Sequence, residues 1–174
     1  MKSDVIKIDN RGGGFKEALI QTEKVAVYKE LNKKETLQLR LCTEEMLSLA
    51  RSVTGEMEAM FWIENDAAKY DLHLSTKTVM DREKRNNLLA SATSRKNEAA
   101  NTFLGMLRDT FESAMMSDPK AGDIPDEAMG DMVNRSIEIP EWDEYEQSIL
   151  KSVSDEVRIA IRGGMVDMTV TKNF

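Results

Sequence analysis

Five short runs of the chain have the composition of strands, and apolar and polar residues alternate with a period of two in all of them except the second, which is rich in Met, Phe, Trp and Ile. These runs are residues 5–9, 56–64, 70–76, 157–161 and 166–170. Residues 65–68 join the second run to the third, and Gly163-Gly164 joins the fourth to the fifth, as expected for tight reversals. These runs therefore predict one short strand and two antiparallel hairpins.

Apolar residues recur at three- and four-residue steps between these runs, which indicates amphipathic helices. The predicted helices are 15–30, 37–53, 81–116 and a last helix between Pro140 and about Ser154. The segment 117–140 is acidic and contains Pro119 and Pro125, so we expect a mobile loop there. The order of elements predicts an α+β two-layer sandwich, with about five mostly antiparallel strands covered on one face by helices.

Composition limits the classes of function. The 174 residues suit one domain, and a formal net charge of -7 argues against nucleic-acid or anionic-membrane partners. Cys42 is the sole cysteine and His73 the sole histidine, which excludes an internal disulfide and a His-rich metal site, so we expect no bound metal. No signal peptide or long apolar run is visible, and a cytoplasmic location is expected.

Glu45 is the most informative position because it falls on the apolar side of the helix predicted over 37–53. At 100° per residue, one face carries Leu39, Cys42, Met46, Leu49 and Val53, and this face is extended by Leu37, Leu41 and Ser48. A carboxylate there needs donors, a cation or a cleft. It is either a structural glutamate that neighbouring donors satisfy or a residue that faces a ligand.

Residues 39–50, LRLCTEEMLSLA, resemble the N-box helix of the GHKL ATPase superfamily, and the order of elements is similar to that of bacterial anti-sigma-factor serine kinases. The resemblance covers residues 1–174 as a single domain, with 81–140 as an expanded lid-like insertion. It places Glu45 on the glutamate that polarises the attacking water. The position of the magnesium-binding asparagine is Leu49, which offers no oxygen to a metal ion.

The other two nucleotide motifs of the family fall on substituted positions. Ser75, Lys77 and Val79 occupy the Asp-x-Gly-x-Gly motif, where side chains replace the glycines that allow a nucleotide to approach. Glu144 and Glu146 stand where glycines open the phosphate-binding turn, and their charges repel phosphate. We therefore expect no nucleotide cofactor, with ATP and magnesium as the alternative.

The resemblance implies a degenerate ATPase-like regulatory domain that acts through protein contacts in bacterial partner switching. The expected partner is a sigma factor or a protein of the anti-anti-sigma type. One alternative is an active ATP-dependent serine/threonine kinase with Glu45 as its base. Another is a structural module that forms a homodimer through the helix 97–116, with Phe103, Leu107 and Phe111 in a two-fold interface, although the same stripe would equally suit packing onto the chain's own sheet.

Overall fold

A computed structural model describes residues 1–9, 13–54, 58–116 and 144–174. The described elements in chain order are β1 (Ile6–Asp9), α1 (Phe15–Tyr28), α2 (Lys33–Thr54), β2 (Glu58–Asp66), β3 (Lys69–Lys77), α3 (Arg82–Ser91), the short 3₁₀ helix η1 (Glu98–Ala100), α4 (Phe103–Met115), α5 (Glu144–Val153), β4 (Glu156–Arg162) and β5 (Met165–Asn173). The predicted strands and hairpins are confirmed, and so is the α+β sandwich.

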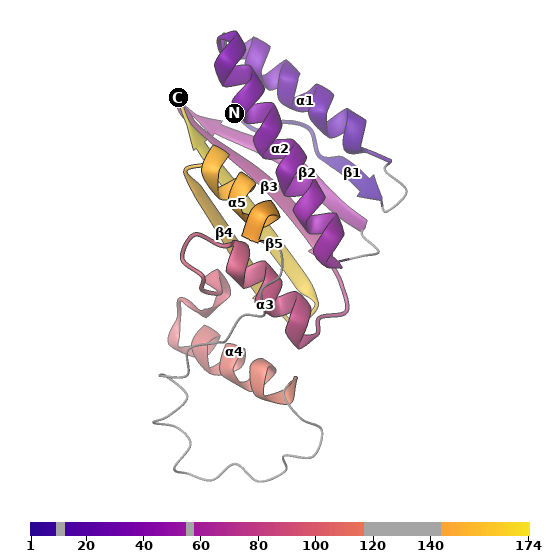
Figure 1. The fold of residues 1–174 in the computed structure, drawn as a ribbon, viewed down its shortest axis with the longest axis vertical. Coiled ribbons are helices and arrows are strands. Elements are labelled where there is room, and N and C mark those ends of the chain that lie inside the picture. The colour runs from indigo at the N-terminus through magenta and orange to yellow at the C-terminus, as the bar shows by residue number, and fades with distance from the viewer. Residues whose placement is uncertain (10–12, 55–57, 117–143) are drawn as a thin grey trace.

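The described strands form one antiparallel sheet in the order β1-β2-β3-β5-β4. The β2–β3 hairpin pairs Asp66 with Lys69, and the β4–β5 hairpin pairs Arg162 with Met165, so each reversal has two residues. In the second reversal Gly163 has a φ of 59°, a conformation that glycine adopts without strain. Figure 1 shows the helices α1, α2, α3 and α5 over one face of this sheet.

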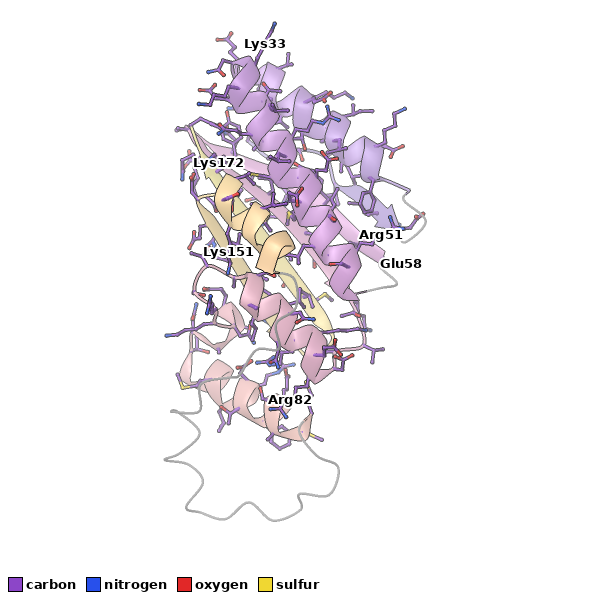
Figure 2. All side chains as sticks on the ribbon, in the orientation of Figure 1. Lys33, Arg51, Glu58, Arg82, Lys151 and Lys172 are labelled. Atoms are coloured by element: carbon purple, nitrogen blue, oxygen red, sulfur yellow. The ribbon has the colours of Figure 1, made fainter. Side chains whose placement is uncertain are left out.

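The core lies between the sheet and these helices because every strand turns alternate residues toward them. The largest fully buried side chains are Leu39, Met46, Leu47, Phe61, Ile63, Leu72, Leu74, Leu88, Leu150, Ile159 and Ile161. Charged residues such as Lys33 and Arg51 mark the two ends of α2 (Figure 2). No helix in the described part of the chain is long and apolar enough to cross a membrane.

The second helix begins at Lys33, four residues before the predicted start, because Asn32 and Glu35 form a capping box. The Asn32 side chain accepts hydrogen bonds from the backbone N–H groups of Lys34 and Glu35, at 2.9 and 3.0 Å. The Glu35 carboxylate accepts the Asn32 N–H at 2.8 Å in return. These bonds satisfy orphan donors of the first turn and stabilise the early start.

The predicted continuous helix 81–116 is wrong, since α3 ends at Ser91 and α4 begins at Phe103. Between them the chain follows the outer edge of β4. Thr93 exchanges two 2.8 Å hydrogen bonds with Val157, in which its N–H donates to the Val157 carbonyl and its hydroxyl accepts the Val157 N–H. Side chains that bond to backbone in this way compete with the helical hydrogen bonds, and the segment also covers an exposed sheet edge. The predicted mobile loop 117–140 lies outside the described residues.

Candidate functional site at the fourth helix

Helix α4 turns its apolar side to solvent. Leu107, Phe111 and Met115 are 56%, 62% and 68% exposed, and their four-residue spacing places them in one row. We call this row the outer face of α4. The helix lies beyond the end of the sheet (Figure 1), so the alternative in which the stripe packs onto the chain's own sheet is not what the structure shows.

The opposite side of α4 is polar and faces the domain. Asp109 forms an ion pair with Arg85 of α3, and the same carboxylate oxygen accepts a hydrogen bond from the Asn97 amide. Arg85 is only 5% exposed. A buried guanidinium needs a counter-charge, so Asp109 must stay on the inner side, and this directs the apolar residues outward.

A second carboxylate, Glu112, attaches α4 to the turn between β4 and β5. It accepts the Gly163 N–H at 3.0 Å and pairs with Arg108 at 2.7 Å. Burial alone would raise the pKa of Glu112, but the hydrogen bonds from Arg108 and Gly163 outweigh it and lower the pKa below the ordinary value. The carboxylate is therefore ionised at neutral pH and holds this end of the helix.

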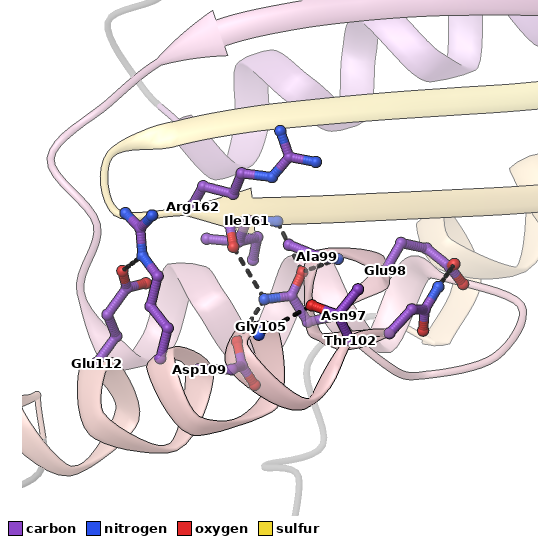
Figure 3. A pocket seen from close by; sticks show the side chains of 11 residues that line it. Asn97, Glu98, Ala99, Thr102, Gly105, Asp109, Glu112, Ile161 and Arg162 are labelled. Atoms are coloured by element: carbon purple, nitrogen blue, oxygen red, sulfur yellow. Dashed lines mark hydrogen bonds and ion pairs between the residues drawn. The ribbon is translucent and has the colours of Figure 1, made fainter.

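Asn97 connects these contacts to the sheet. Its amide donates to the Ile161 carbonyl at 2.9 Å and accepts the Ile161 N–H at 2.7 Å, as a neighbouring strand would. Figure 3 shows Asn97 between Ile161 and Asp109, at the wall of a cavity of about 360 Å³ that Arg108, Glu112 and Arg162 also line. The orientation of α4 is thus fixed by polar contacts to three separate elements.

Glu45 lies at the border of the buried side of α2 rather than within it. Leu37 is exposed and Leu41 half-buried, so the apolar stripe does not extend in their direction. It extends on the other side, through Thr43, Leu47 and Ala50, and Glu45 is half-buried. Leu49 is buried in the core at 7% exposure.

The residues at the second nucleotide motif lie apart from this helix. Ser75 is on the sheet face opposite the helices, where its hydroxyl donates to Asp167 at 2.6 Å. Lys77 is exposed at the end of β3, and Val79 is exposed beyond it. The side chains of Glu144 and Glu146 lie outside the described residues. The structure therefore does not bring Glu45, Leu49 and Ser75 together around one cavity.

The helix-free face of the sheet carries a polar and aromatic cluster. The rings of Trp62 and His73 stack with centroids 5.0 Å apart, and Lys2 lies over Trp62 at 4.8 Å. Thr169 contacts His73 Nδ1 at 3.2 Å, and Glu64 accepts the Trp62 ring N–H at 3.0 Å. His73 itself is half-buried on β3.

Within the described ranges, no three His, Cys, Asp or Glu side chains gather in a way that would hold a metal ion. The sequence matches no known protein family, and no curated protein matches it either. The orientation of α4 is the most specific feature of the described geometry.

Proposed function

We propose that the chain is a protein-binding regulatory domain that places the outer face of α4 in an apolar groove of a partner protein. The observation that carries the proposal is the reversed orientation of an amphipathic helix, whose polar side is buried against the domain while Leu107, Phe111 and Met115 face solvent. Rows of exposed apolar side chains cost solubility and are retained mainly where they bind something.

The shape of this face favours a groove. A helix that binds in a groove uses anchors on one face, spaced three or four residues apart, and residues 107, 111 and 115 have this spacing. Three side chains that each expose on the order of 100 Å² would leave two copies joined along this row alone well below the about 1,200 Å² at which stable interfaces begin. A partner with a groove can also contact the two flanks of the outer face of α4. Such a partner therefore fits this face better than a second copy of the chain.

The regulatory role and the partner class rest on the resemblance of residues 39–50 and of the element order to anti-sigma-factor kinases. On that basis the partner would be a sigma factor or a protein of the anti-anti-sigma type. The kinase alternative needs a nucleotide beside Glu45. The two cavities at α4 are lined by residues of 82–116, 161 and 162, which include none of the nucleotide-motif positions.

Site-specific photocross-linking in the source cells tests the proposal. A photoreactive phenylalanine analogue replaces Phe111 in one variant and Leu37, an equally exposed helix residue 64% accessible on α2, in the control. We expect position 111 alone to give a discrete product with another protein, and Leu107→Asp to abolish it. A product of twice the chain mass would instead support the homodimer, and identical patterns from both positions would refute the role of α4.

A further inference from the structure

A second cavity of about 630 Å³ lies between α3, the loop before η1 and the inner side of α4. Its charged lining consists of Arg82, Arg85, Arg95, Lys96 and Asp109. Arg82 lies at the end of α3 nearest α4 (Figure 2). Four basic side chains and one carboxylate make this cavity positively charged, although the net charge of the chain is -7.

The one carboxylate of the cavity is already occupied. Asp109 accepts from both Arg85 and Asn97 through the same oxygen. Within the described ranges, Arg85 is the member of the basic group that forms an ion pair, whereas Arg82, Arg95 and Lys96 form none. Among the residues that the structure describes, three exposed cations at this cavity therefore have no ion-pair partner.

Arg85 supplies the most direct sign of a missing acceptor. Its side chain is 6% exposed, yet among the described residues its Nη1 has no hydrogen-bond partner. Buried donors are nearly always paired because an unpaired one keeps its full desolvation cost. The guanidinium donates to Asp109 through Nη2, and its Nη1 is available for an acceptor at the cavity wall.

Backbone conformation and electrostatics at Arg95 agree with this. Arg95 has a φ of 54°, in the left-handed region that arginine seldom adopts, so the fold holds the backbone there in a strained conformation. The positive field reaches beyond the cavity. Burial, followed by the charge of Arg95, lowers the pKa of Lys151, whose ammonium donates to the Ala90 carbonyl at 2.6 Å.

We propose that this cavity binds a phosphate group, either as free inorganic phosphate or as the phosphoryl end of a small molecule. A carboxylate can be satisfied by one arginine, whereas a tetrahedral dianion accepts hydrogen bonds from several donors that approach from different elements. Here the donors come from α3 and the following loop. Leu89, Ala100 and Met106 add an apolar wall that an organic part could contact. The site is independent of the proposed function of the outer face of α4.

Titration of the full chain with inorganic phosphate, ribose 5-phosphate, adenosine monophosphate and sodium acetate tests the site, with chloride keeping the ionic strength constant. Calorimetry measures affinity, and amide NMR shifts of residues 85 and 95–101 locate binding. We expect a dissociation constant of about 1 mM or lower for phosphate and at least tenfold weaker binding of acetate. If an organic phosphate binds more tightly than inorganic phosphate, the ligand is a phosphorylated small molecule. If their affinities are equal, the ligand is inorganic phosphate itself.

Two double variants distinguish specific binding in the cavity from nonspecific electrostatic attraction of phosphate to the chain. Arg95→Gln with Lys96→Gln should weaken phosphate binding at least about fivefold, because both residues are exposed and their loss leaves the fold intact. Lys33→Gln with Lys34→Gln removes the same charge from an exposed basic pair on α2 and should leave affinity unchanged. Absence of binding at 10 mM phosphate, or equal loss in the two double variants, would overturn the proposal.

Discussion

Arg85 of α3 and Asp109 of α4 form an ion pair whose arginine side chain is 6% and aspartate side chain 23% exposed. The pair joins two helices that the sequence suggests are one. Because Asp109 also accepts from Asn97, which is bonded to β4, the same carboxylate links α4 to both α3 and the sheet edge. The direction in which α4 presents its apolar residues depends on this contact.

Asp109→Asn should detach α4 without unfolding the sheet. The change leaves a buried guanidinium without its counter-charge, which costs about 3–5 kcal/mol when a buried pair is broken, and undocking of α4 relieves that cost. Hydrogen-exchange mass spectrometry should show faster exchange over 97–115 and unchanged exchange over β2 and β3. Asp66→Asn, the same change at an exposed residue that ends β2, is the control. Protection of α4 equal to wild type would contradict the role of the pair.

The sheet and the first two helices are predictable from sequence because their signals are local. Alternation marks the buried face of every strand except β2, where residues 59–63 are all apolar. Gly163-Gly164 marks a reversal, and the capping residues of α2 are present at Asn32 and Glu35, although periodicity alone misses them. The break after Ser91 is not predictable in the same way. It depends on hydrogen bonds from Thr93 and Asn97 to β4, more than 60 residues later in the chain.

Thr22 of α1 and Thr43 of α2 form a polar contact inside the core, and we expect their stability effects to be coupled. Both are fully buried, their hydroxyl oxygens lie 2.9 Å apart, and each also lies within hydrogen-bond distance of a carbonyl of its own helix. Either Thr→Val change should lower the free energy of unfolding by about 1–2 kcal/mol, because the remaining hydroxyl loses a partner.

The double variant Thr22→Val, Thr43→Val should lose less than the sum of the two single changes, since each single change already removes the contact between the two hydroxyls and it can be lost only once. Denaturant unfolding measures the cycle. The matched cycle combines Thr22→Val with Thr36→Val, whose hydroxyl donates to the nearby Leu31 and Asn32 carbonyls. That cycle should be additive, and additivity in the Thr22–Thr43 cycle would show that the contact contributes nothing.

Cys42 should be unreactive in the folded chain. Burial raises the pKa of its thiol to about 11, and the sulfur contacts the Val153 carbonyl at 3.5 Å. At pH 8 only about one thiol in a thousand is then ionised, and the thiolate is the reactive form. A thiol-specific dye should label the native chain at least about 100-fold more slowly than the chain unfolded in guanidinium. Similar rates in both states would place Cys42 outside the core.

The residues of the candidate site can be predicted from the sequence, but the direction that they face cannot. The Leu107-Phe111 stripe and its four-residue spacing are evident from the amino acids, as is the cluster of basic residues from Arg82 to Lys96. The direction in which the stripe faces is not evident from the sequence. It depends on the ion pair of Asp109 with Arg85 and on the hydrogen bond that Glu112 accepts from the Gly163 N–H. An aspartate and a glutamate three residues apart, one opposite the apolar stripe and one beside it, are typical of a solvated face, and the sequence does not reveal their long-range partners.

The stack of His73 on Trp62 predicts a pH-dependent change in fluorescence and stability. Burial lowers the pKa of His73 below its ordinary value, although Glu64 and Asp71 act in the opposite direction. The unfolded chain therefore takes up the proton first as the pH falls. The free energy of unfolding should be largest above about pH 6.5 and should decrease as the pH falls toward the lower pKa of the folded state.

Emission from Trp62 reports the same event, since a protonated imidazole in contact with an indole quenches it. In a Trp142→Phe background, where Trp62 is the sole tryptophan, emission should fall with a midpoint below the ordinary histidine value of about 6.5. His73→Gln should remove both the fluorescence step and the associated loss of stability. A midpoint at or above 6.5 would mean that Glu64, 3.8 Å from the ring nitrogen, outweighs burial and holds the histidine in its charged form.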